Sequence, residues 1–213
     1  MRRLFIAINL PENIKEAIEE IVNDLKISMN QHVDQLNQQI EIRFLPKENW
    51  HLTISFLGYQ PIDADLRGQS TLTAIIESIK EAAKKFSAAK IEFKKIMLAP
   101  PNKSPRMIWL SGTKETSKIL GVIKTKLENE LIKNRVQFKK ENRGFNCHLT
   151  LARFPVPLQK YENIRLSKKL IPRLGVIYEK QLPISFDAQS LDLMESRLKR
   201  TGAKYEILAS ISF

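Results

Sequence analysis

HLTIS, at residues 51–55, recurs later in the chain as HLTLA, at residues 148–152. Each copy reads histidine, leucine, threonine, an aliphatic residue and a small residue, and the two copies hold two of the chain's three histidines. Alternation of polar and aliphatic side chains is typical of a half-buried β-strand. The repeat therefore predicts two equivalent strands, one in each half of the chain.

Strict alternation assigns the side chains of the first copy to two faces. His51, Thr53 and Ser55 are expected on one face, and Phe56 is expected on the opposite, aliphatic face, in the core. Phe56 and the neighbouring Trp50 could stack nucleobases, but the core position of Phe56 is the stronger expectation.

In the second copy, alternation places His148 and Thr150 together and Arg153 on the other face. Arg153 could reach the histidine side around the strand end near Pro155, or through a β-bulge. An exposed arginine, or one paired with a carboxylate, is the alternative. Two such strands facing one cleft would bring together two imidazoles and two hydroxyls, which suits acid–base chemistry on a phosphate.

The elements around the two copies follow a similar order in both halves. Strands are expected at 3–9, 40–45, from 51, 91–98, 106–111, 136–138, from 148, 184–194 and 205–213. Helices are expected from Pro11, over 70–86, between 116 and 132, and over 158–171, with a polar loop from Ser28 to Gln39.

This order predicts an α+β fold built by pseudo-symmetric duplication of a β-α-β-β unit. The expected domain is a single bilobal one over residues 1–213, with lobe units of about 1–100 and 101–213. Two mainly antiparallel sheets would line a central cleft, with the helices outside. The alternative is two unrelated strands whose histidines never meet.

The composition of the chain indicates the class of its binding partner and the compartment in which it works. The chain has 213 residues, is 43% hydrophobic and carries a net charge of +12, which favours a polyanionic partner such as nucleic acid. A Lys-rich composition without a dedicated binding face is the competing explanation. The single cysteine, Cys147, excludes an internal disulfide and is expected as a buried thiol in a reducing compartment. The apolar runs are too short for a signal peptide or a membrane span, which predicts a cytoplasmic protein.

Neither a metal nor a cofactor is expected. The histidines and the cysteine show no zinc-like spacing, and His32 is expected on the surface of the polar loop. With seven glycines, the chain lacks a glycine-rich phosphate loop.

The two copies, extended to HLTISFLG at 51–58 and HLTLAR at 148–153, resemble the paired HxTx motifs of the two-histidine (2H) phosphoesterases. The resemblance is greatest to the RNA 2′,3′-cyclic phosphodiesterases, also called LigT-like proteins or 2′-5′ RNA ligases. It covers nearly the whole chain, apart from a longer polar stretch at 29–39. Three further stretches add to it: RLFIAI at 3–8, RMIWL at 106–110 and LMES at 193–196.

The resemblance implies metal-independent hydrolysis of an RNA or nucleoside 2′,3′-cyclic phosphate to a 2′-phosphomonoester. It implies that His51 is the proton donor and His148 the proton acceptor. Thr53, Thr150 and Arg153 would bind the phosphate. Histidine suits both roles because its ordinary pKa lies near neutrality, although the residues alone do not assign which imidazole is which.

The resemblance leaves other activities open. The same fold could act as a 2′-5′ RNA ligase or on another cyclic or 2′-5′-linked nucleotide. It could also be an RNA- or nucleotide-binding module without turnover. The expected partners are RNA or nucleotides with a 2′,3′-cyclic phosphate and no membrane, and the protein is expected to be a monomer.

Overall fold

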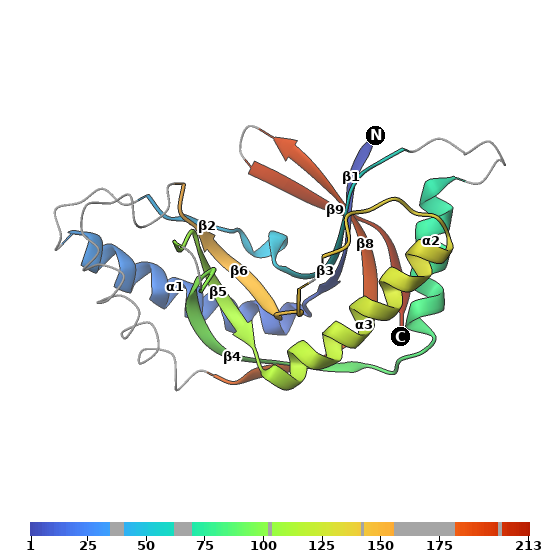
Figure 1. Ribbon diagram of the computed structural model, residues 1–213. Helices are drawn as coiled ribbons and strands as arrows, with labels where there is room; N and C mark the ends of the chain where they lie inside the picture. The colour runs from blue at the N-terminus through green and yellow to red at the C-terminus, as the bar shows by residue number, and fades with distance from the viewer. Residues whose placement is uncertain (35–40, 62–69, 102–103, 142, 156–181, 200–201) are drawn as a thin grey trace.

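The structure is a computed structural model that describes residues 1–34, 41–61, 70–101, 104–141, 143–155, 182–199 and 202–213 (Figure 1). The predicted helix over 158–171 lies outside these residues. The elements in chain order are β1 (Arg2–Asn9), α1 (Glu12–Asp34), β2 (Arg43–Phe44), a 3₁₀ turn (Lys47–Asn49), β3 (His51–Gln60), α2 (Thr71–Ala83), β4 (Ala89–Ala99), β5 (Met107–Gly112), α3 (Lys114–Lys133), β6 (His148–Arg153), β7 (Ile184–Ala188), β8 (Ser190–Lys199) and β9 (Gly202–Ser212).

The described strands form two antiparallel sheets, which confirms the predicted α+β class. Sheet A has the order β3-β1-β8-β9, and sheet B has the order β2-β6-β5-β4-β7. Each sheet takes strands from both halves of the sequence, since β8 and β9 join β1 and β3. The two strands of the repeat, β3 and β6, belong to different sheets and contact each other near the middle of the molecule (Figure 1).

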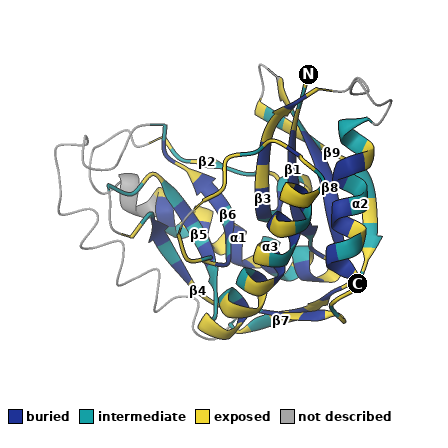
Figure 2. Cartoon of the chain, turned by 45° about the vertical axis from the view of Figure 1, so that its right-hand side comes forward, coloured by how far each residue is buried: buried dark blue, intermediate teal, exposed yellow. Residues whose placement is uncertain are grey.

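The main core lies on one face of each sheet. In β1, Leu4, Ile6 and Ile8 belong to this core, whereas Phe5 and Ala7 form a small cluster on the other face with Met194 and Tyr205. Figure 2 shows buried and exposed residues alternating along the strands. Sheet A is therefore apolar on both faces around β1, and its second face carries the first histidine.

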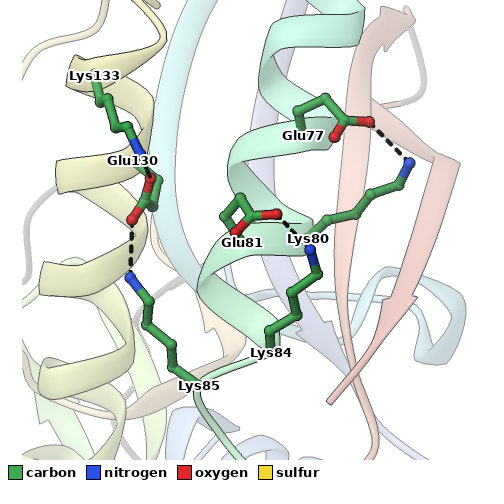
Figure 3. A network of polar contacts seen from close by, with 7 residues as sticks. All are labelled: Glu77, Lys80, Glu81, Lys84, Lys85, Glu130 and Lys133. Carbon is green, nitrogen blue, oxygen red and sulfur yellow. Dashed lines mark hydrogen bonds and ion pairs between the residues drawn. The ribbon is translucent and has the colours of Figure 1, made fainter.

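Helices α2 and α3 pack against each other beside sheet A (Figure 1). Each begins at a hydroxyl cap: Ser70 accepts a hydrogen bond from the amide of Thr73, and Thr113 accepts one from the amide of Thr116. Ion pairs lie on the solvent-facing side of this helix pair, among them the pair of Lys85 with Glu130 (Figure 3). Such exposed pairs contribute little to stability, so the buried faces hold the helices in place.

Helix α1 runs to Asp34, so the loop predicted from Ser28 is wrong over 28–34, and His32 lies in the helix. The reason is that Met29, four residues after the buried Leu25, is itself buried and extends the apolar stripe.

The strand predicted at 136–138 is also wrong: α3 ends at Lys133, and Val136 takes part in the turn that closes the helix. Arg135 has a positive φ of 60°, and its amide donates to the carbonyl of Ile132. The amide of Val136 donates to the carbonyl of Leu131. This is the Schellman arrangement that satisfies the last carbonyls of a helix.

Two other predicted strands differ in length. The strand expected at 40–45 is reduced to β2, which has two residues. The strand expected at 184–194 is two strands, β7 in sheet B and β8 in sheet A. The chain therefore changes sheets at Gln189, although the apolar pattern continues through it.

Candidate active site

Two β-bulges decide which side chains of β3 share a face. The pairing of β3 with β1 shifts by one residue between Leu4 and Phe5 and again between Ile6 and Ala7. Each shift places an extra residue in β3 and reverses the alternation beyond it. The resulting histidine face of β3 carries, in order, His51, Thr53, Phe56 and Tyr59, which lie opposite Asn9, Ala7, Phe5 and Arg3 of β1.

The bulges overturn the predicted faces of Ser55 and Phe56. Ser55 is 3% exposed and donates a hydrogen bond to Glu128 of α3 at 3.4 Å, so it lies on the core side. Phe56, expected in the core, is 57% exposed. Trp50 is buried and donates its indole N–H to the carbonyl of Leu45 at 3.2 Å, which removes it as a stacking surface.

The second histidine strand contains the same irregularity. Ile108 of β5 pairs with Ala152, but Trp109 pairs with Thr150, so Leu151 is the extra residue. Ala152 is consequently buried and Arg153 is exposed. The bulge turns Arg153 to the side of His148 and Thr150, which is one of the two routes that the sequence left open.

Backbone carbonyls orient both imidazoles in the same way. Nδ1 of His51 lies 2.9 Å from the carbonyl oxygen of Asn49, and Nδ1 of His148 lies 2.8 Å from that of Asn146. A carbonyl can only accept, so Nδ1 carries the hydrogen in each ring. Nε2 of each ring is thereby left as the proton-transfer atom.

Aromatic side chains surround the two imidazoles. The ring centre of His51 lies 4.9 Å from that of Phe5 and 4.8 Å from that of Tyr205, which meets it edge-on. His148 stacks on Trp109 with ring centres 3.8 Å apart. None of these three neighbours was predicted as a site residue, although Phe5 and Trp109 lie in stretches that carry the family resemblance. For Phe5 a signal existed, since alternation in β1 separates it from Leu4 and Ile6.

The apolar surroundings favour neutral imidazoles. Burial lowers the pKa of His51 to about 4, and its hydrogen bond to the Asn49 carbonyl opposes this shift. The positive charge of Arg153, and that of His148 whenever its ring is protonated, lower the pKa of His51 further. Burial also lowers the pKa of His148. At neutral pH both rings are therefore uncharged in the free protein.

The structure brings three of the predicted site residues close enough for their charges to interact. Arg153 and His148, from β6 of sheet B, act on the charge of His51, from β3 of sheet A, and the two strands are in contact. Thr53 and Thr150 are each half-buried, one position along from the histidine on the same face. Two imidazoles and a guanidinium, carried by strands of different sheets, are thus close enough for the charge of one to affect another.

Cys147 does not belong to this set. It is buried on the opposite side of the strand from His148, and burial raises the pKa of its thiol to about 12. The thiol therefore stays protonated and is a poor nucleophile. Within the part of the chain that the structure describes, no three His, Cys, Asp or Glu side chains are grouped so as to hold a metal ion.

None of the described helices combines the length and the apolar character needed to cross a membrane.

Comparison with known proteins places the chain among phosphoesterases. The model of the family LigT like Phosphoesterase matches residues 8–109, which include the first HLT copy. The chain is 30% identical over 210 residues to an RNA 2′,3′-cyclic phosphodiesterase of Methanocaldococcus jannaschii, with 97% of this chain and 98% of the relative covered. It is 27% identical over 153 residues to the Archaeoglobus fulgidus protein of the same name, with 71% and 72% covered.

Solved structures show the same fold. A Thermus thermophilus protein superposes with a TM-score of 0.67 at 20% identity, over 99% of this chain and 97% of the other. Escherichia coli LigT complexed with 3′-AMP superposes with a TM-score of 0.57 at 19% identity, over 100% and 98%. The resemblance noted in the sequence is thus confirmed over nearly the full length, and the chain belongs to the LigT-like phosphoesterases of the 2H superfamily.

Proposed function

We propose that the protein hydrolyses the 2′,3′-cyclic phosphate end of RNA or of a nucleotide to a 2′-phosphomonoester, with His51 as proton donor and His148 as proton acceptor. The observation that carries the proposal is the matched pair of imidazoles, each with Nδ1 committed to a carbonyl two residues earlier. An in-line displacement at phosphorus requires one group that accepts a proton and one that donates a proton, and the two Nε2 atoms can fill these roles. The names of the curated relatives support the choice of substrate.

In this reaction a water oxygen attacks phosphorus while Nε2 of His148 accepts one of its protons. The bond between phosphorus and the ribose 3′-oxygen breaks, and Nε2–H of His51 protonates the leaving oxygen. The hydroxyls of Thr53 and Thr150 donate to the non-bridging oxygens, and the guanidinium of Arg153 offsets their negative charge. The chain's own side chains supply both proton transfers, so the proposal includes no metal.

The low pKa of His51 makes the donor role depend on the substrate. In the free protein His51 is neutral at pH 7, and a neutral Nε2 has no proton to give. A phosphodiester anion beside the ring stabilises the imidazolium, because an opposite charge within a few Å raises the pKa of a cationic group. Binding of the substrate therefore favours the protonated form of His51, which is the form that acts as the general acid.

The test is incubation of the purified protein with adenosine 2′,3′-cyclic phosphate in excess EDTA, with the product identified as the 2′- or 3′-monophosphate. We expect 2′-AMP. His51→Ala and His148→Ala should each lower kcat by about 10²–10⁴-fold, the usual contribution of one acid or base. Thr53→Val should cost less, because it removes a single hydrogen bond. His32→Ala, which removes the third histidine, is the matched control and should keep full activity.

Two results would contradict the proposal. Activity that EDTA abolishes and a divalent ion restores would refute the metal-free mechanism. A His51→Ala or His148→Ala variant with more than about a tenth of wild-type turnover would exclude that imidazole from proton transfer.

A further inference from the structure

The histidine face of β3 continues beyond the phosphate-binding residues as an aromatic surface. Phe56 is 57% exposed and Tyr59 is 63% exposed, and both follow Thr53 on the same face. Exposed apolar side chains that are neighbours on one face, rather than scattered singly, mark a binding surface. At a strand rise of ~3.3 Å per residue, successive positions on one face are ~7 Å apart.

The corresponding position on the other histidine strand has a different chemistry. One bulge brings Phe56 to the histidine face of β3, and the same irregularity brings Arg153 to the histidine face of β6. The two strands therefore offer a phenyl ring on one side of the phosphate site and a guanidinium on the other. A ligand with a phosphate at one end and a planar apolar group at the other can set the planar group against Phe56 and the phosphate beside Arg153.

Phe5 links the aromatic surface to the imidazole. Its ring centre lies 4.9 Å from that of His51 and 6.2 Å from that of Phe56. Phe5 is 2% exposed, so it acts as a fixed support rather than as a contact surface. The path from His51 to Phe56 is thus continuous, and a base attached to the ribose at the histidines would meet Phe56.

The charge beside the surface favours nucleic acid over an apolar protein segment. Arg3 is exposed and lies directly across from Tyr59 in the β1–β3 pairing. The chain as a whole carries a net charge of +12. Alternating aromatic and cationic side chains on a sheet are the usual means of holding single-stranded RNA, because bases stack while phosphates pair with arginine.

We propose that Phe56, Tyr59 and Arg3 form a track for the last two nucleotides of single-stranded RNA, an inference that rests on the proposed function of the histidine site. The terminal base stacks on Phe56, the preceding base stacks on Tyr59, and Arg3 binds the phosphate between them. The preferred substrate is then an oligonucleotide rather than a free cyclic nucleotide.

The test compares kcat/KM on adenosine 2′,3′-cyclic phosphate with kcat/KM on a triadenylate that ends in the same cyclic phosphate. Tyr59→Ala should lower the value for the triadenylate by roughly 5- to 150-fold, the range for loss of one stacked base, and leave the mononucleotide unchanged. Phe56→Ala should lower both values, and Phe56→Tyr should restore them. Val122→Ala, at a residue 46% exposed on α3, is the control for loss of an exposed apolar side chain.

Equal effects of Tyr59→Ala on both substrates, or no effect on either, would overturn the track while leaving the proposed hydrolysis intact. If the wild-type protein cleaves neither substrate, the proposed function is refuted, and the track is then tested by RNA binding alone. Fluorescence anisotropy with a labelled triadenylate 3′-phosphate should then show weaker binding by the Tyr59→Ala protein than by the Val122→Ala protein. Equal affinity of the two variants would overturn the track. Equal affinity is also the result expected if the surface binds a protein instead of RNA.

Discussion

Binding of an anion at the histidine site should change the protonation of His51. In the free protein burial lowers the pKa of this ring to about 4. Relative to an ordinary histidine near 6.5, that shift corresponds to about 3 kcal/mol against the charged form. A unit negative charge ~4 Å from the ring contributes about 4 kcal/mol at the effective dielectric constant of a protein surface. The anion should therefore return the pKa of His51 to its ordinary range.

Sulfate is a suitable probe, because it resembles phosphate and does not titrate between pH 4 and pH 8. The imidazole NMR signals of the protein, assigned with His51→Gln and His148→Gln variants, would be followed against pH with and without saturating sulfate. At pH 5.5 we expect His51 to be almost wholly neutral in the free protein and mostly charged in the complex. The same change should appear in calorimetry as uptake of close to one proton by His51.

Either of two results would refute this reasoning. An ordinary titration of His51 in the free protein would show that the aromatic neighbours do not desolvate it. A low pKa that persists when sulfate is bound, with binding verified by movement of the His148 signals, would show that the anion does not sit beside the His51 ring. In that case His51 could not serve as the general acid near neutral pH.

Two predictions concern stability. The ammonium of Lys124 bonds the carboxylate of Glu128 in the interior, where the two residues are 8% and 3% exposed. Glu128→Ala should therefore lower the free energy of unfolding by about 3–5 kcal/mol. The Lys124→Met, Glu128→Leu double variant should lose much less stability, because it leaves no buried charge unpaired. Equal losses for the two proteins in urea unfolding would contradict the pairing. His51 binds a proton more readily unfolded than folded, so its contribution is present above pH 6.5 and is lost as the pH falls to about 4. Between pH 7 and pH 4 the wild type should thus lose up to about 3 kcal/mol more than His51→Gln, and identical losses would rule this out.

The sequence by itself determined the family and most of the local elements. The two HLT copies are β-strands as predicted, β3 and β6, because an alternating aliphatic pattern can bury only one face of a strand. Helices α2 and α3 start at hydroxyl caps, and the helices follow apolar stripes that can be read directly from the sequence. The family follows from the same motifs, since imidazole and hydroxyl at fixed spacing are uncommon without a function.

Only the tertiary structure decided which side chains accompany the histidines. A bulge depends on the pairing of a strand with its neighbour, and that neighbour is distant in sequence: β1 for Phe56 and β5 for Arg153. Alternation alone placed both residues on the wrong face. The pairing of β8 with β1, and the low pKa of His51 beside Phe5 and Tyr205, likewise arise from contacts between segments far apart in the chain. Local pattern fixes the kind of strand, but the register with a partner strand fixes its faces, and only the folded chain sets that register.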